Sequence, residues 1–324
     1  MNRYIAFISL VWIVYALGIG PSTVQAQPYP SHPVHMVVPM DAGSMADTAA
    51  RGVTDEFGKI LKTPVVVLNK PGAAATLGTD FVVKSKKDGY TIVYAPTSAI
   101  VYARATNPEI VPYDPAKDLE PLGLHCYIPL AVAVQESSPW KTFKELIDHA
   151  KQNPGSIRFG IQGLGSIDHF NLEIIKSLTG TQFNIIPFKG PAATATAMLG
   201  GHVDATVLAE GLVGPHARAG KLRILLFSLK MRKYPNVPTI TELGYNQGLH
   251  SGWFAWFAPV GIPDDVKRVL VPAIEKMVKT PEVVEKIEKL GLIVDYKPPE
   301  ELRKIVTGEY EVARGIALKL GLGK

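Results

Sequence analysis

The chain reads Val34-His-Met-Val-Val-Pro-Met-Asp-Ala-Gly-Ser-Met-Ala-Asp-Thr-Ala-Ala-Arg-Gly52 close to its N-terminus. The apolar start, Val34–Val38, predicts a strand, and the spacing of apolar and small residues predicts a helix from Asp47. A Gly/Ser loop between a strand and a helix start directs free backbone N–H groups and the positive helix end into one hollow. Such a hollow binds an anion, most often a carboxylate or a phosphate. A plain strand-to-helix turn with Asp47 as the N-cap is the alternative.

The same arrangement recurs between Arg158 and Leu172, where the loop Gln162-Gly-Leu-Gly-Ser166 follows a predicted strand. We interpret the protein as two such hollows that face each other. The second loop is neither a G-x-S-x-G nucleophile elbow nor a phosphate loop ending in Gly-Lys-Ser/Thr. Ser166 is therefore expected to cap the helix and to donate a hydrogen bond to an anion. His169 either contacts a ligand or packs in the first helical turn.

Short β-type runs alternate with helical runs, which predicts parallel sheets with helices on both faces. Ligands of such sheets bind beyond the carboxyl ends of the strands, here segments 39–47, 69–75 and 95–98. Thr97 and Ser98 in the last segment either contact a ligand or cap the following helix. The predicted strands are 34–38, 65–68, 91–94, 130–134, 158–160, 183–187, 203–208, 222–227 and 253–257, and the predicted helices are 47–61, 73–84, 142–151, 168–178, 192–199, 264–280, 281–290 and 299–320.

The composition is typical of a globular protein with a large core, since 47% of the 324 residues are hydrophobic and 19% are charged. The N-terminal region differs: a basic start is followed by an apolar run over 4–19 and by the small residues Val24 and Ala26. This pattern predicts a signal peptide over 1–26 that is cleaved before Gln27. We therefore expect an exported, soluble protein.

The length suggests two domains of about 150 residues each. Residues 27–128 together with 229–324 are expected to form domain 1. Residues 129–228, which carry their own alternation of strands and helices, are expected to form domain 2, inserted into domain 1. The aromatic run Trp253-Phe-Ala-Trp-Phe257 is expected to pack in the core as a strand.

Several function classes find no support in the sequence. The net charge is +5, but the lysines are dispersed and no basic stripe alternates with aromatic residues, which argues against nucleic-acid binding. The eight histidines form no HxxxH or HExxH group, so no metal or cofactor is expected. Cys126 is the only cysteine and is expected in the core. Lys189 either supplies a point charge to an anion or is solvated. No carboxylate pair or catalytic triad emerges, so binding is favoured over catalysis.

Ordered landmarks run through the chain: Tyr29-Pro-Ser-His-Pro-Val34, Val38-Pro39 with Asp47, Asn69-Lys-Pro-Gly-Ala73, Asp88-Gly-Tyr-Thr91, Pro112-Tyr-Asp-Pro-x-Lys-Asp118, Gly163-x-Gly-Ser-x-x-His169, Pro187-Phe-Lys-Gly190, Gly200-Gly-x-Val-Asp204, Ala219-Gly-Lys-Leu-Arg223, Pro235-x-Val-Pro-Thr239, Trp253-Phe254 and Ala258-Pro-x-Gly-x-Pro263. With these landmarks the mature chain resembles the extracytoplasmic solute receptors of tripartite tricarboxylate transporters, often called Bug-type proteins. The resemblance implies an α/β fold of the periplasmic-binding-protein type (type II), with two domains joined by a hinge and the ligand cleft between them.

The resemblance also implies function. It indicates a monomeric periplasmic receptor, not an enzyme and without cofactors, that closes on a small carboxylate and delivers it to integral-membrane transporter subunits. In such receptors the first loop and the Gly-x-Gly-Ser loop bind carboxylate oxygens across the cleft. Carried over to this chain, the expected binding residues are Met40, Asp41, Ala42, Gly43, Ser44, Asp47, Thr97, Ser98, Gln162, Gly163, Leu164, Gly165, Ser166, His169, Lys189 and Gly190.

The first loop departs from the family pattern, which usually has Phe, Pro and paired glycines. Met40, Ala42, Gly43 and Ser44 stand there instead. A rim containing Met40 and Met45 suits a partly apolar carboxylate, such as an aromatic or longer dicarboxylic acid. Two alternatives use the same fold. One is a ligand-sensing component of a signalling system, and the other is an enzyme whose nucleophile is Cys126.

Overall fold

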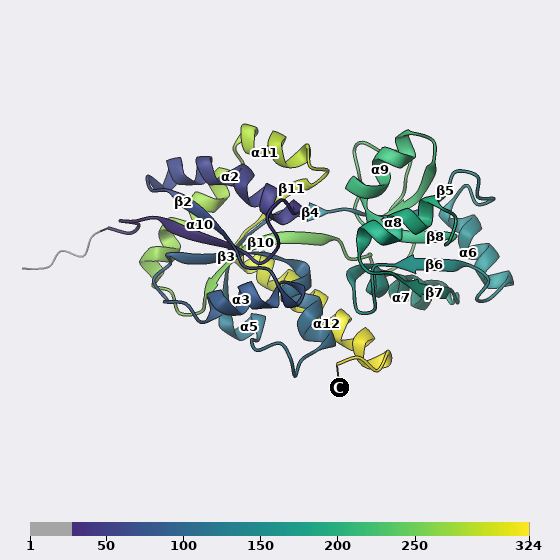
Figure 1. Ribbon diagram of the computed structural model, residues 1–324, viewed down its shortest axis with the longest axis horizontal. Coiled ribbons are helices and arrows are strands. Elements are labelled where there is room, and N and C mark those ends of the chain that lie inside the picture. The colour runs from purple at the N-terminus through teal and green to yellow at the C-terminus, as the bar shows by residue number, and fades with distance from the viewer. Residues whose placement is uncertain (1–27, 324) are drawn as a thin grey trace, which may run out of the picture.

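The computed structural model describes residues 28–323, which form two β-sheets flanked by helices (Figure 1). The six-stranded sheet has the order β11-β4-β10-β3-β1-β2, and the five-stranded sheet has the order β7-β6-β8-β5-β9. The predicted signal peptide, 1–26, lies outside the described residues. Within residues 28–323, no helix combines the length and apolar character needed to cross a bilayer.

The elements alternate along the chain. The strands are β1 (Val34–Val38), β2 (Val65–Asn69), β3 (Thr91–Pro96), β4 (Leu119–Ile128), β5 (Leu130–Gln135), β6 (Arg158–Ile161), β7 (Asn184–Pro187), β8 (Ala205–Ala209), β9 (Leu222–Phe227), β10 (Gly252–Pro259) and β11 (Ile293–Lys297). The helices are α2 (Met45–Leu61), α3 (Thr76–Val83), α4 (Ala103–Thr106), α5 (Pro115–Asp118), α6 (Phe143–Gln152), α7 (Ile167–Thr179), α8 (Pro191–Leu199), α9 (Glu210–Arg218), α10 (Asp264–Val278), α11 (Pro281–Glu288) and α12 (Pro299–Lys319), with a 3₁₀ turn η1 (Ala73–Ala75) and a π-helical turn η2 (Ser98–Tyr102).

Both sheets are mixed, so the prediction of parallel sheets was wrong in part. Strand β1 pairs in parallel with β2 and β3, whereas β10 runs antiparallel to β3, β4 to β10 and β11 to β4. In the second sheet β6 is parallel to β7 and β8, and β5 is antiparallel to β8 and β9. Strands β4 and β10 carry the chain to the second sheet and back. No helix connects either strand to a parallel neighbour in the same sheet. Their antiparallel direction therefore follows from the passage of the chain to the second sheet and back.

Helices cover both faces of each sheet. Successive side chains of a strand point to opposite faces, so apolar residues on both faces are buried under helices. On β10, Phe254 and Trp256 pack with the buried residues of α2, α10 and α11, while Trp253 and Phe257 pack with those of α3 and α12 on the other face. Figure 1 shows α2 and α11 above this sheet and α3, α5 and α12 below it. The second sheet is covered by α6 and α7 on one face and by α8 and α9 on the other.

The chain crosses between the two sheets twice, after β4 and after β9, and these two connecting segments lie next to each other. The Leu130 N–H donates to Ser228 Oγ at 2.9 Å, and the Ser228 N–H donates to the Leu130 carbonyl at 2.8 Å. Ser228 Oγ is also 2.7 Å from Ser251 Oγ, just before β10. These contacts couple the outgoing and returning segments. Domain boundaries at 128/129 and 228/229 stay a prediction.

Helix α3 depends on a close backbone approach at Gly78. A Cβ built on Gly78 would lie 2.5 Å from the Lys70 carbonyl oxygen and 2.9 Å from Pro39 Cα. We expect Gly78→Ala to lower the free energy of unfolding by about 1–3 kcal/mol through overpacking. The matched control is Gly308→Ala in α12, where nothing lies within 4 Å of the added Cβ. That change should raise the free energy of unfolding by about 0.5–1 kcal/mol. Urea denaturation measures both, and equal effects would contradict the close approach.

Candidate functional site

The carboxyl ends of parallel strands from both sheets meet at one cavity of about 740 Å³. The first sheet contributes Met40 after β1, Ala73 and Ala74 after β2, and Pro96 with the residues after it at the end of β3. From the second sheet come the loop 162–167 after β6, Pro191 after β7 and Ala209 at the end of β8. The volume lies in the range of small-molecule sites. Both sheets therefore place the carboxyl ends of their parallel strands at the same cavity, and this is the edge where α/β sheets generally bind ligands.

No Asp, Glu, Lys, Arg or His side chain lines the cavity among the described residues. The polar groups that line it are hydroxyls and amides, supplied by Thr76, Thr97, Ser98, Tyr102, Thr106, Asn107, Gln162 and Ser166. The remaining lining is largely apolar and includes Met40, Met45, Ile110, Val111, Ile128, Leu130, Leu164, Ile167, Leu212, Trp253 and Phe254. An anion in this cavity would meet neutral groups and not an ion pair. The hydroxyls of Thr76, Thr97 and Thr106 already donate to backbone carbonyls. Ser166 Oγ likewise donates to the Gly163 carbonyl and makes no side-chain cap, so the predicted capping and anion-donor role of this hydroxyl was wrong for the conformation seen here.

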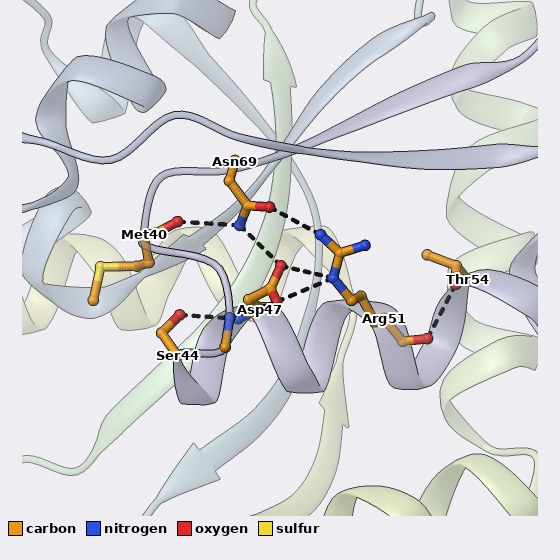
Figure 2. Close-up of polar contacts among 7 residues, drawn as sticks. Met40, Ser44, Asp47, Arg51, Thr54 and Asn69 are labelled. Atoms are coloured by element: carbon orange, nitrogen blue, oxygen red, sulfur yellow. Dashed lines mark hydrogen bonds and ion pairs between the residues drawn. The ribbon is translucent and has the colours of Figure 1, made fainter.

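The first loop is held from behind by the carboxylate of Asp47 (Figure 2). Asp47 Oδ2 accepts the Gly43 N–H at 2.9 Å, both carboxylate oxygens accept Arg51 Nε at 3.0 Å, and Oδ1 accepts Asn69 Nδ2 at 2.8 Å. Asn69 Nδ2 also donates to the Met40 carbonyl at 3.1 Å, and Arg51 Nη2 donates to Asn69 Oδ1 at 2.9 Å. This network ties the loop after β1 to the end of β2.

Helix α2 begins at Met45, two residues earlier than predicted, and its N-cap is Ser44 and not Asp47. Ser44 Oγ accepts the Asp47 N–H at 3.2 Å, which leaves the Asp47 carboxylate free for the network behind the loop. Burial alone would raise the pKa of Asp47, but hydrogen bonds from Arg51, the Gly43 N–H and Asn69 hold it below its usual value. The group is therefore a carboxylate at neutral pH.

The second loop is held in a similar way by the first turn of α7. The carboxylate of Asp168, which is fully buried, accepts the Gln162 N–H, and His169 Nδ1 accepts the Gly165 N–H at 3.0 Å. Burial raises the pKa of Asp168 to about 6, and burial lowers the pKa of His169. An unprotonated Nδ1 is what the contact with Gly165 requires. His169 is therefore packed in the first turn of α7, and its contact with a ligand stays a prediction.

The predicted binding residues fall into two groups. Met40, Thr97, Ser98, Gln162, Gly163, Leu164, Gly165 and Ser166 line the cavity, whereas Asp41, Ala42, Gly43, Ser44, Asp47, His169, Lys189 and Gly190 do not. Asp47 and His169 lie behind the two loops, and Lys189 is exposed. Ligand contact by any of these residues stays a prediction.

Thr97 does more than line the cavity. Its hydroxyl accepts the Trp253 N–H at 2.6 Å and donates to the Trp253 carbonyl at 3.1 Å, which joins the end of β3 to β10. It makes no side-chain cap for the following turn. Sequence reasoning missed most apolar lining residues, among them Ile110, Leu212 and Trp253, because they come from segments outside the glycine-rich loops.

Cys126 is a core residue. It is fully buried in β4, with Sγ 3.8 Å from Tyr94 Oη, and burial raises the pKa of its thiol to about 12. The neighbouring His125 is also fully buried, and burial lowers its pKa to about 3. A thiol in this state is unreactive. In the part of the chain that the structure describes, no group of three or more His, Cys, Asp or Glu residues could hold a metal ion.

Replacement of Asp47 by Asn should destabilise the protein by about 1–3 kcal/mol, since the amide nitrogen would face donors that now meet a carboxylate. Because the pKa of Asp47 is lowered in the folded state, its stabilisation is complete above the ordinary value of 3.8. It is lost as the pH falls through the lower folded-state value. The difference in unfolding free energy between wild type and Asp47→Asn should therefore shrink below about pH 4. Asp55→Asn, at an exposed position on the same helix, is the control, and a pH-independent difference would contradict the network.

Comparison with known proteins agrees with this architecture. Residues 49–322 match the family model described as "Tripartite tricarboxylate transporter family receptor". The chain is 32% identical to Protein BugT of Bordetella pertussis over 323 residues, which cover 99% of this chain and 98% of the relative. Two solved structures share the fold. One is an R. palustris protein with adipate (TM-score 0.74, 25% identity, 91% of this chain and 99% of that chain), and the other is MatC from Rhodopseudomonas palustris with bound malate (TM-score 0.70, 26% identity, 89% and 100%). The chain therefore belongs to the tripartite tricarboxylate transporter family of periplasmic solute-binding receptors, and it is a receptor and not an enzyme.

Proposed function

We propose that this protein captures a small carboxylate in the cavity between its two sheets and delivers it to the membrane subunits of a tripartite transporter. The observation that supports this most is the convergence of two helix N-termini on one cavity. Met45 and Ala46 open α2, Ile167 opens α7, and all three line the cavity. The first N–H groups of a helix have no partner within the helix and carry its positive partial charge. A carboxylate fits such an environment without a charged side chain.

The proposed ligand has an apolar body. The cavity lining combines a few hydroxyls and amides with many aliphatic and aromatic side chains, such as Ile128, Leu212 and Phe254. Hydroxyl groups of a polar acid would lie against apolar surface and lose hydrogen bonds to water. Among the structural relatives, one is bound to adipate and one to malate, so both an aliphatic and a hydroxylated dicarboxylate are relevant probes. For this chain we favour dicarboxylates with a longer hydrocarbon chain, or aromatic acids, over tricarboxylates and malate.

The proposal includes two domains, 27–128 with 229–324 and 129–228, that close on the ligand. It also includes export to the periplasm after removal of residues 1–26. The adjacent passages at Leu130 and Ser228 support a hinge, because motion there leaves both sheets intact.

A thermal-shift screen tests ligand binding. Purified 27–324 is heated with C4–C8 dicarboxylates, tricarboxylates and benzoate- or phthalate-type acids, and an acid at a hundredfold excess over its Kd should stabilise the protein by about 2.7 kcal/mol. Titration calorimetry then ranks the acids. A ranking with malate above adipate and the aromatic acids would overturn the apolar ligand class. If no acid raises the melting temperature, mass spectrometry of the denatured protein shows whether an acid had co-purified with it. A flat screen without a co-purified acid would overturn carboxylate binding itself.

A charge placed at the cavity rim tests the site. Leu164 lines the cavity and is 66% exposed, so its replacement should leave the fold intact. Leu164→Asp should weaken binding of the best acid about fivefold by like-charge repulsion, and more at low salt. Leu164→Asn is the size-matched neutral control. Equal affinities of the two variants would show that the acid binds elsewhere.

Delivery to a transporter is tested in cells. Deletion of the gene should abolish uptake of the radiolabelled acid at low concentration, and plasmid-borne wild type should restore it. Unchanged uptake, together with a changed transcriptional response to the acid, would favour the signalling alternative.

A further inference from the structure

Three consecutive alanines adopt a left-handed backbone in the loop after β2. Their φ angles are +47° at Ala73, +53° at Ala74 and +73° at Ala75, and Gly72 before them has φ +131°. For residues with a Cβ this region is strained, whereas glycine adopts it without steric penalty. Such outliers persist only where the surrounding structure imposes them, and they concentrate at functional sites.

The surrounding contacts hold the loop firmly. Thr76 Oγ1 donates to the Ala73 carbonyl at 2.7 Å, and Thr79 Oγ1 donates to the Ala75 carbonyl at 2.8 Å. One turn later, Gly78 packs against the Lys70 carbonyl and Pro39, as described above. The left-handed turn is therefore clamped between the end of β2 and helix α3.

The three alanines differ in their exposure and in whether they line the cavity. Ala73 and Ala74 are exposed and line the cavity, whereas Ala75 is buried and does not line it. The sequence pattern predicts that segment 69–75 lies at the ligand edge, but the expected binding residues do not include it. Glycine would satisfy the backbone at all three positions, so the methyl groups of the two exposed alanines are the feature that glycine cannot supply.

We propose that Ala73 and Ala74 determine ligand specificity, by presenting their methyl groups as an apolar wall against the hydrocarbon part of the bound acid. This inference rests on the proposed carboxylate-receptor function. The backbone strain is retained because its relief by glycine would remove the wall. The ligand class that this wall selects is a carboxylate with an unsubstituted aliphatic or aromatic body, at the expense of hydroxylated acids of similar length.

The test compares Ala74→Gly with Ala75→Gly, using adipate, benzoate and malate as probes in titration calorimetry. Ala74→Gly should weaken binding of adipate or benzoate, whichever binds wild type more tightly, about two- to fourfold through the lost methyl contact. Its melting temperature without ligand should rise by about 1–2 °C as the strain is relieved. Ala75→Gly relieves the same kind of strain behind the wall and should leave all affinities unchanged.

A second variant keeps the size of the wall and changes its polarity. Ala74→Ser adds a hydroxyl at the cavity surface and should shift the malate-to-adipate affinity ratio at least threefold toward malate. Unchanged ratios in Ala74→Gly and Ala74→Ser would overturn the inference while leaving the receptor proposal in place. Equal losses in Ala74→Gly and Ala75→Gly would also overturn it, because they would indicate a loop-wide effect. If wild type binds none of the acids in the wider panel, the proposed function fails and this inference fails with it.

Discussion

Parallel strands end at the same edge of a sheet, and the architecture of the site depends on this constraint. In the first sheet the loops that follow β1, β2 and β3 lie at one edge. In the second sheet the loops that follow β6, β7 and β8 also lie at one edge. The two edges face one cavity of about 740 Å³. Helices α2 and α7 start at these edges, so the positive ends of both helices lie at the same space. The chemistry of the cavity thus follows from topology more than from any charged side chain.

Charged groups act behind the loops and not in the cavity. Asp47 collects hydrogen bonds from Gly43, Arg51 and Asn69, and Asp168 accepts the Gln162 N–H from a fully buried position. Each carboxylate accepts a hydrogen bond from a backbone N–H of its loop and thereby holds the loop in place. In the proposed function a ligand would meet a preformed, neutral surface, which would favour binding by limiting the entropy lost on loop ordering. The buried acids are best understood as positioning groups.

The segment after β2 contains one glycine that is required and three alanines in a conformation that favours glycine. Gly78 must be glycine because the backbones of Lys70 and Pro39 approach it closely, while Ala73, Ala74 and Ala75 stand where glycine would be less strained. Within this short segment, glycine is required at position 78, whereas alanine stands at three positions that would favour glycine. A close approach explains the first, and the role in ligand specificity that we propose for the cavity-lining Ala73 and Ala74 would account for the second.

Much of the architecture was present in the sequence. The apolar runs at Val34–Val38 and Leu222–Phe227 predicted strands, and the Gly/Ser loops predicted the sheet edges that meet at the cavity, because these signals are local and depend on residues a few positions apart. Tertiary contacts decided the rest. Strand β10 enters the first sheet between β3 and β4, which lie more than a hundred residues before it, and Ile110, Leu212 and Trp253 meet in one cavity from three distant segments. The left-handed Ala73–Ala75 turn was also hidden, since alanine by itself favours a right-handed helix and only the contacts around it hold the strained form.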